Sequence, residues 1–404
     1  MSLPTLDRVE VRGKTVLLRV DINSPLDPKT GEILEDSRIR ECAPTIKELA
    51  GKGAKVVVLA HQGRPGDEDF SRLEKHAKRM EEILGMRVKY VPDLLGPSAK
   101  EAIKGLKEGE VLLLENVRFY AEESLTGTPE QMARTFLVRE LSSLADLYVN
   151  DAFGAAHRGQ PSLVGFGAVL PTYAGRLMER ELKGLSRARE PERPCIYVLG
   201  GGKSKDSMSM IENVLSKGIA DMVLTGGLVA LLFLSASGID LGEPSFQVLR
   251  EKGFEKERER AKKLLSTYGE KIKLPVDVAV ERGNKREELE VSSLPVNAPI
   301  KDIGSRTIGE YSQIIRGAKT VVANGPLGVF EEKEFEKGTV EVLRAMVDSR
   351  AYTIVGGGHM VAAAEKAGVL SKLSHVSTGG GACISFLAGE PMPVVDLLLK
   401  TKTG

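Results

Sequence analysis

Short apolar segments alternate with longer segments of helical spacing along most of the chain. Strand-like runs occupy residues 14–20, 54–60, 111–116 and 146–151, and residues 39–53 carry apolar side chains at helical spacing before ending at glycine. This alternation is typical of a parallel sheet that is covered by helices. The first half of the chain is therefore predicted to form an α/β domain.

The same pattern restarts after the polar segment at 189–194. Strand-like runs lie at 195–201, 222–227, 271–280, 320–326 and 352–358, and several of them end in glycine. Between the halves, residues 174–190 are long, charged and helix-forming, and we interpret them as a helix that joins two domains. Two domains also suit the length, because 404 residues are too many for one hydrophobic core.

Composition narrows the classes of function. The net charge is +1, so no global positive field attracts nucleic acid, and we expect no nucleic-acid partner. No apolar run approaches the ~18 residues that cross a membrane, and the N-terminus lacks the apolar region of a signal peptide. The three cysteines lie far apart, which predicts neither a metal pair nor a disulfide framework and suits a reducing cytoplasm.

Charged side chains follow the predicted strands of the first half. The run "VVLAHQGRP" at 57–65, for example, passes from a strand directly into histidine and arginine. Ligands of open parallel sheets bind beyond the carboxyl ends of the strands. The residues at these ends are Asp21, Asn23, His61, Arg64, Arg118, His157 and Arg158, with Arg38 near the start of the first helical pattern.

Each of these residues alone has a plain structural interpretation. A single arginine is usually solvated, a histidine after a strand is usually a structural hydrogen-bonder, and Asp-x-Asn is a common turn former. As a set, however, the cations would converge on one edge of one sheet and repel one another unless an anion joined them. Guanidinium groups fit carboxylate and phosphate, so the set predicts a site for a small, multiply charged acid.

The second half carries four glycine runs next to strand ends. They are "GGGK" at 200–203, "TGGL" at 225–228, "GGGH" at 356–359 and "TGGGA" at 378–382. One glycine pair is usually a plain turn, but four runs together predict a cradle for polyphosphate, because glycine allows close backbone approach and helix starts offer free N–H groups. This is not a Walker A loop, whose first glycine would fall at Tyr197. Glu331, in "NGPLGVFE" at 324–331, would either accept from ribose hydroxyls or open an acidic helix.

The order and spacing of these motifs resemble the phosphoglycerate kinase family along nearly the whole chain. The matching stretches are "RVDIN", "AHQGRP", "ENVRFY", "VNDAFGAAHR", "GRLMEREL", "LGGGKSKD", "NGPLGVFE", "GGGH" and "STGGGA", and details resemble the archaeal branch. The resemblance implies two Rossmann-like α/β domains, each a parallel sheet covered by helices. They would be a phosphoglycerate-binding domain at 1–174, a hinge helix at 175–189, a nucleotide-binding domain at 190–388 and a segment at 389–404 that returns to the first domain.

The implied reaction is reversible phosphoryl transfer between 1,3-bisphosphoglycerate and ADP, with Mg²⁺, giving 3-phosphoglycerate and ATP. Both possible nucleophiles are already ionised, so the task is alignment and charge neutralisation, without a general base. Domain closure would bring the two substrates together. We expect a monomer, with a dimer as the alternative, and a cytoplasmic location.

The resemblance also assigns roles to residues of this sequence. The acid substrate would contact Asp21, Asn23, Arg38, His61, Gln62, Gly63, Arg64, Arg118 and Arg158. The nucleotide would contact Gly201, Gly202, Lys203, Gly226, Gly227, Asn324, Pro326, Glu331, Gly357, Gly358, His359 and Met360. The transferred phosphoryl group would be stabilised by Arg38, Lys203, Gly358 and Gly381.

The sequence departs from the family pattern at two positions. Many members have a second lysine where this chain has Ser207, and whether the nearby Lys205 replaces it stays open. Many have an aspartate, a usual metal contact, where this chain has His359, so we assign no protein ligand to the metal.

Two rival classes fit less well. An NAD-dependent dehydrogenase predicts G-x-G-x-x-G after the first strand, where this chain reads "DINSP". An RNA-binding protein predicts a basic, aromatic-rich surface, but the net charge is +1 and tryptophan is absent from the sequence.

Overall fold

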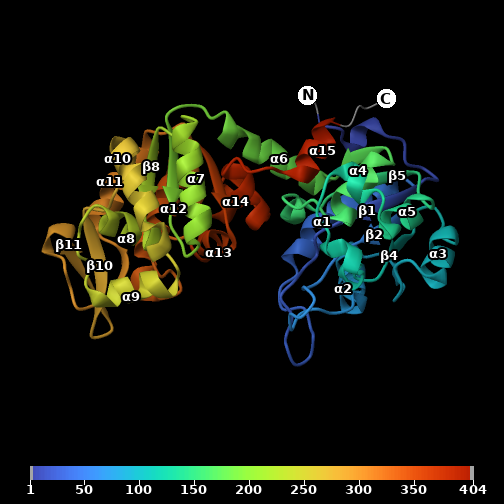
Figure 1. The fold of residues 1–404 in the computed structure, drawn as a ribbon, viewed down its shortest axis with the longest axis horizontal. Helices are drawn as coiled ribbons and strands as arrows, with labels where there is room; N and C mark the ends of the chain where they lie inside the picture. Colours follow the sequence, from blue (N-terminus) through green and yellow to red (C-terminus); the bar gives the residue numbers. More distant parts are fainter. Residues whose placement is uncertain (1–2, 401–404) are drawn as a thin grey trace. The chain divides into compact units, whose positions relative to one another are not determined.

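The chain folds into two compact α/β units. The computed structural model describes residues 3–400, and residues 1–2 and 401–404 of the predicted terminal segments lie outside this range. The first unit runs to Leu182 and takes up the chain again from Pro391, and the second comprises Lys183–Glu390. The boundary therefore lies inside helix α6 (Arg176–Arg189), within the segment that was predicted as the joining helix. A six-stranded sheet in each unit (Figure 1) confirms the predicted fold class.

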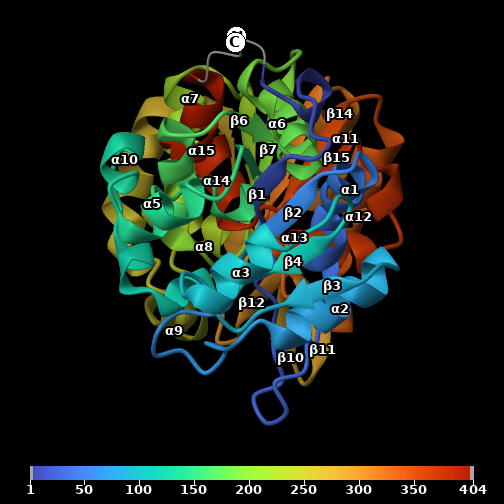
Figure 2. The ribbon, with the colours of Figure 1, turned by 90° about the vertical axis from the view of Figure 1, so that its right-hand side faces the viewer.

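The sheet of the first unit has the strand order β3-β4-β2-β1-β5-β6, and its pairings are parallel. Its strands are β1 (Thr15–Arg19), β2 (Lys55–Leu59), β3 (Val88–Tyr90), β4 (Val111–Leu113), β5 (Leu147–Asn150) and β6 (Thr172–Ala174). Its helices, besides the first part of α6, are α1 (Ser37–Gly51), α2 (Glu74–Leu84), α3 (Pro97–Lys104), α4 (Pro129–Met132), α5 (Phe136–Ser142) and α15 (Pro393–Lys400). The labels β1, β2, β4 and β3 follow one another in this order in Figure 2.

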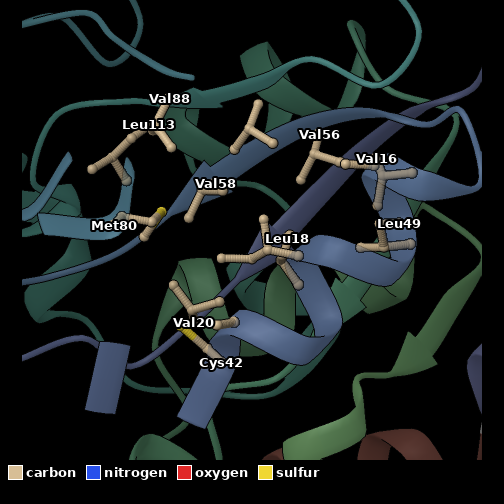
Figure 3. Close-up of a cluster of buried hydrophobic side chains, with 14 of the residues drawn as sticks. Val16, Leu18, Val20, Cys42, Leu49, Val56, Val58, Met80, Val88 and Leu113 are labelled. Carbon is tan, nitrogen blue, oxygen red and sulfur yellow. The ribbon is translucent and has the colours of Figure 1, made fainter. Parts of the chain in front are cut away.

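Both faces of this sheet are buried. Val16, Leu18 and Val20 point toward α1, where they join Cys42 in one hydrophobic cluster (Figure 3). The intervening Leu17 belongs to a second cluster on the opposite face, together with side chains of α3 and α5. Burial on both faces explains why the strands are continuous apolar runs. Polar side chains are consequently left to the loops at the strand ends.

The second unit repeats this plan with the strand order β15-β14-β13-β7-β8-β9, again with parallel pairings. Its sheet contains β7 (Cys195–Leu199), β8 (Met222–Thr225), β9 (Ile272–Lys273), β13 (Thr320–Asn324), β14 (Tyr352–Gly356) and β15 (His375–Val376). Its helices are α7 (Ser204–Ser216), α8 (Gly227–Ala236), α9 (Glu243–Glu251), α10 (Arg258–Tyr268), α11 (Ser305–Arg316), α12 (Lys337–Asp348), α13 (Gly358–Lys366) and α14 (Gly381–Leu387). Side chains of α11, α12 and α13 form one core with β7, β13 and β14.

A small antiparallel sheet in the second unit corrects one expectation. The run at 271–280 was predicted as a single strand, but the structure divides it into β9 of the parallel sheet and β10 (Asp277–Arg282). Pro275 lies between them, and proline lacks the N–H that a continuous ladder requires. The strand β10 pairs instead with β11 (Lys285–Glu290) and β12 (Ile300–Ile303).

The last described helix belongs to the first unit although it follows the second in sequence. In Figure 1 the red α15 lies beside elements of the first unit, and Val394 N–H donates to the Ala156 carbonyl oxygen at 3.2 Å. Leu397 fills the space above Gly167, where an added Cβ would lie 2.4 Å from its side chain. Within residues 3–400, no helix combines the length and the apolar character needed to cross a membrane.

Candidate functional site

The end of β1 presents a buried carboxylate to an arginine. Asp21 is 5% exposed, and Arg38, in the first turn of α1, donates from one of its terminal nitrogens to Oδ2 of Asp21. A Cβ at Gly154 would lie 2.2 Å from the same oxygen, so only glycine fits there. Burial raises the pKa of Asp21, but the charges of Arg38 and then Arg19 oppose this effect, and the pKa lies below its ordinary value. Asp21 is therefore ionised at neutral pH.

The loop that follows β2 is held by its own side chains. Gln62 is fully buried, and its Oε1 accepts from Ser24 N–H at 2.9 Å while its Nε2 donates to Ser24 O at 2.9 Å and to Asp69 Oδ2 at 3.2 Å. Gly63 has φ +64° and donates from N–H to Asn23 Oδ1 at 2.8 Å. The amide of Gln62 is thus engaged within the protein, and it fixes the loop that carries its neighbours.

Three of the predicted arginines line one pocket of about 520 Å³ in the first unit. Arg64, Arg118 and Arg158 share its wall with Glu123. Burial, followed by the charges of Arg158, Arg19 and Arg64, lowers the pKa of Arg118 to about 10. The three arginine charges add to the effect of burial, and a bound anion would offset their repulsion.

Arg158 connects this pocket electrostatically with the end of β1. Burial lowers its pKa; Asp21 opposes that shift, and Arg64, Arg19 and Arg38 add to it. The neighbouring His157 accepts from Arg158 Nε at 3.3 Å through its Nε2. The structure therefore places Arg64, Arg118 and Arg158 on one pocket wall, and Arg158 interacts electrostatically with Asp21 and Arg38 at the end of β1.

A second pocket, of about 320 Å³, lies at the strand ends of the second unit. It is bordered by the loops that follow β7, β13 and β14 and by the start of α14. Nine of the predicted nucleotide residues line it: Gly201, Gly202, Lys203, Asn324, Pro326, Gly357, Gly358, His359 and Met360.

Two kinds of glycine line this pocket. Some are required by the protein itself, since a Cβ at Gly325 would lie 2.4 Å from the carbonyl oxygen of Gly200. In contrast, a Cβ at Gly202 or Gly358 would meet no protein atom within 4 Å, and neither residue has positive φ. The protein does not require glycine at these two positions. The free space is therefore available to a ligand.

Asn324, the last residue of β13, offers an unused donor in this pocket. Its Nδ2 is buried and has no hydrogen-bond partner. A Cβ at Gly357 would lie 3.1 Å from this nitrogen, so the amide lies close to the backbone that leads into α13. Buried donors are normally satisfied, so this amide is available to donate to a ligand oxygen.

A third pocket, of about 270 Å³, adjoins the second and shares Gly201, Gly202, Pro326 and His359 with it. Its wall is mostly apolar, with Leu228, Leu231, Val278, Ile303, Leu327 and Val329. Glu331 also lines it, and α12 begins only at Lys337, so Glu331 does not open that helix.

Two predicted glycines do not line these pockets. Gly226 lies against Leu327, where an added Cβ would come within 2.2 Å of the leucine side chain, and its neighbour Gly227 lines the apolar pocket. Gly381 opens α14, while Gly380 before it lines the 320 Å³ pocket.

The structure shows where the residues at the positions that depart from the family pattern lie. Ser207 is buried and lines the 320 Å³ pocket, whereas Lys205 is exposed and does not line it. Asp206 is the carboxylate that lines this pocket, and sequence reasoning missed it although it lies three residues after Lys203 in the first turn of α7. Within residues 3–400, no three His, Cys, Asp or Glu side chains converge to form a metal site.

Comparison with known proteins identifies the family of the chain. A model of the phosphoglycerate kinase family matches residues 6–390. The phosphoglycerate kinase of Methanobacterium bryantii is 53% identical over 100% of this chain and 99% of that protein, and that of Methanothermus fervidus is 52% identical over 98% and 96%. The crystal structure of phosphoglycerate kinase from Pyrococcus horikoshii OT3 superposes with a TM-score of 0.91 at 45% identity, covering 98% of both chains. The chain belongs to the phosphoglycerate kinase family.

Proposed function

We propose that this chain transfers a phosphoryl group between 1,3-bisphosphoglycerate and ADP, with the acid bound by the first unit and the nucleotide by the second. One observation carries this division. The arginine pocket of the first unit suits a small polyanion, and the glycine-lined pocket of the second unit continues into an apolar one, as phosphates and a nucleoside require.

The acid substrate is bound by charge and by a fixed loop. Arg64, Arg118 and Arg158 bind its phosphate and carboxyl groups, and Asp21 and Asn23 contact its hydroxyl-bearing part. Gln62 and Gly63 act chiefly by holding the loop, because the Gln62 amide is engaged within the protein.

The transfer itself needs no general base, since the attacking carboxylate or phosphate oxygen is already ionised. Arg38 and Lys203 neutralise the transferring group. The Asn324 amide and the N–H groups at Gly358 and Gly381 add neutral donors that are in place before reaction. Glu331 accepts from the ribose hydroxyls, and Gly227 borders the base.

When bound, magnesium would supply charge neutralisation on the nucleotide phosphates. The side chains that line the 320 Å³ pocket fit this ion only in part, because it prefers oxygen and His359 offers nitrogen. We assign its binding mainly to the phosphate oxygens, with Asp206 as the carboxylate on the pocket wall. His359 then contacts a phosphate oxygen or the start of α13.

The reaction requires groups of both units to act on the same transferred phosphoryl group. The acid ligands precede residue 160 and the nucleotide ligands follow residue 199, so they belong to different units. In-line transfer requires reacting atoms within ~3–3.5 Å. Closure about α6 and the segment before α15 would meet this requirement. We also propose that the protein is a monomer and that it is located in the cytoplasm.

Calorimetric titration of single-site variants tests the division of labour. Arg118→Met should abolish measurable 3-phosphoglycerate binding and leave ADP binding unchanged, while Lys203→Met should do the reverse. Arg306→Met, an exposed arginine that pairs with Glu290 outside the pockets, is the control and should leave both affinities unchanged. Loss of ADP binding in Arg118→Met, with its folding intact, would contradict the assignment.

A further inference from the structure

Arg19, the last residue of β1, is buried beneath the acid-binding side chains. Only 1% of its surface is exposed. Its Nε donates to Ser162 Oγ at 2.8 Å, and one terminal nitrogen donates to the carbonyl oxygen of Val20. Its other terminal nitrogen lies 3.0 Å from Nδ1 of His61. An arginine is seldom buried to this extent without partners for its donors, and His61 is one of the three partners of Arg19.

This contact determines where the proton of His61 lies. A guanidinium group has only donors, so Nδ1 of His61 must accept and must therefore be unprotonated. The proton of the neutral ring is left on Nε2, which lies 4.0 Å from Oδ1 of Asp21. We propose that Arg19 is a positioning residue that fixes His61 as the neutral Nε2–H tautomer, so that Nε2–H is the donor presented to the acid substrate. The second half of this proposal rests on the proposed function.

The charges around His61 support the neutral form. The groups that face it are Asp21 after β1, Arg118 in the short helix after β4, Arg158 in the loop after β5, and Arg19 itself. Burial and the three arginines lower the pKa of His61 well below its usual value, against the opposing effect of Asp21. A protonated ring would also place an N–H on Nδ1 directly against the guanidinium of Arg19.

Arg19 is itself held in place from behind. The hydroxyl of Ser162 accepts from Arg19 and donates to Oε1 of Glu123 at 2.5 Å, and the backbone N–H of Ser162 donates to Oε2 at 3.0 Å. Glu123 is 1% exposed, and burial raises its pKa, whereas the charge of Arg19 and the two hydrogen bonds from Ser162 favour its ionised form. The series Glu123–Ser162–Arg19–His61 thus links a buried carboxylate to the ring with one donor at each step. Because every member is engaged, the ring orientation is determined before substrate arrives.

Nitrogen-15 NMR of the histidine rings tests the tautomer directly. The chain has five histidines, and His61→Gln identifies the resonance of interest. In the wild type, His61 should show a protonated Nε2 and an unprotonated Nδ1, with no titration between pH 8 and about 6. Arg19→Met removes the donor at similar length, so the ring should populate both tautomers and its titration midpoint should rise by about one pH unit or more. Arg64→Met, which removes an arginine that does not contact His61, should leave the ring signals unchanged.

Binding supplies a second readout that a merely structural role would not produce. At pH 8, Arg19→Met should bind 3-phosphoglycerate about tenfold more weakly than the wild type, the scale of one lost hydrogen bond to a charged group. The deficit should shrink as the pH falls toward 6, because the ring of the variant becomes charged and regains an N–H at Nε2. The amide of His61→Gln donates near the position of Nε2. Adding Arg19→Met to this variant should therefore weaken 3-phosphoglycerate binding by much less than tenfold.

If Arg19→Met alone does not fold, Arg19→Met combined with Glu123→Gln removes the unpaired carboxylate, and the same NMR spectra are recorded. A wild-type ring protonated on Nδ1, or ring signals unchanged by loss of Arg19, would overturn the proposal. A different result would overturn the proposed function and leave the Arg19–His61 relationship intact. In that case the His61 ring would show the expected tautomer in the wild type and the expected change in Arg19→Met, but the protein would not bind 3-phosphoglycerate.

Discussion

Arg38 and Asp21 form a hydrogen-bonded ion pair that joins the start of α1 to the end of β1. The carboxylate is almost completely buried, whereas the arginine side chain keeps 33% of its surface exposed. The carboxylate thus anchors a guanidinium whose side chain is still partly exposed. Such preorganised positive charge is what phosphoryl transfer requires, since the protein need not reorganise as charge develops.

Arg38→Ala should reduce kcat by about 10²-fold or more, the scale of losing one preorganised donor. Arg40→Ala, on the same helix, removes an exposed arginine that pairs with Asp36 and should leave kcat within about twofold. Steady-state kinetics in both directions measures the effect. An unchanged kcat with only a raised KM would make Arg38 a ground-state binding residue.

Two neighbouring glycines should respond oppositely to alanine. Gly358→Ala places its methyl group in open space at the start of α13, so stability should be unchanged or rise by up to ~1 kcal/mol while ADP affinity falls. Gly357→Ala should lower stability, because Gly357 has φ +85° and its Cβ would approach Asn324. Urea unfolding and ADP titration compare the two variants. Full ADP affinity in Gly358→Ala would show that the free space is not the phosphate path.

His359→Asp should retain activity and tighten the dependence on magnesium, since a carboxylate replaces a poor ligand for a hard cation. Titration of activity and of ADP binding with Mg²⁺ measures this change. A structure with Mg²⁺ and nucleotide should place the His359 nitrogens well beyond ~2.2 Å from the metal. Direct nitrogen–magnesium coordination, or a folded but inactive His359→Asp variant, would refute the assignment.

Solution scattering should detect closure of the two units. The radius of gyration should decrease when 3-phosphoglycerate and nucleotide are both bound, and much less with either one alone. Arg118→Met should show no decrease with both ligands, because it lacks the acid-binding arginine. Equal radii for free and doubly liganded wild type would argue against closure about α6.

Because Asp302 is buried, the free energy of unfolding should fall as the pH rises from about 4 to 6. Burial raises its pKa to about 6, although Gly338 and Arg286 stabilise the charged form, and the unfolded value is ~3.9. The unfolded chain therefore loses its proton first, so the contribution of this group declines through that window and is constant above it. Denaturant midpoints between pH 4 and 7.5 measure the slope. Asp302→Asn should reduce it, and an identical slope in the variant would assign the effect to other groups such as Asp151, whose pKa is also raised to about 6.

The strands of the two parallel sheets, and the polar or glycine residues that follow them, were predictable from the sequence. A strand that is buried on both faces is a continuous apolar run, so its end is easy to recognise. The antiparallel β11 was not predictable, since it is highly charged and mostly half-exposed or exposed; its hairpin signal was the pair Gly283 and Asn284, both with positive φ. Nothing in the sequence pattern singles out Arg19. It lies inside a strand run, and only the structure shows that the side chain is buried against His61. Gln62 was predicted as a ligand from its motif, but its amide faces Ser24 and Asp69, which no local pattern indicates.

The most direct test is an assay of ATP consumption that depends on 3-phosphoglycerate, coupled to reduction of the acyl phosphate product, with and without Mg²⁺. The account predicts turnover only when 3-phosphoglycerate, ATP and Mg²⁺ are all present, and strong loss of turnover in both Arg118→Met and Lys203→Met. A folded wild-type protein that consumes no ATP in response to 3-phosphoglycerate, while it oxidises a hydroxy acid with NAD or binds RNA, would contradict it.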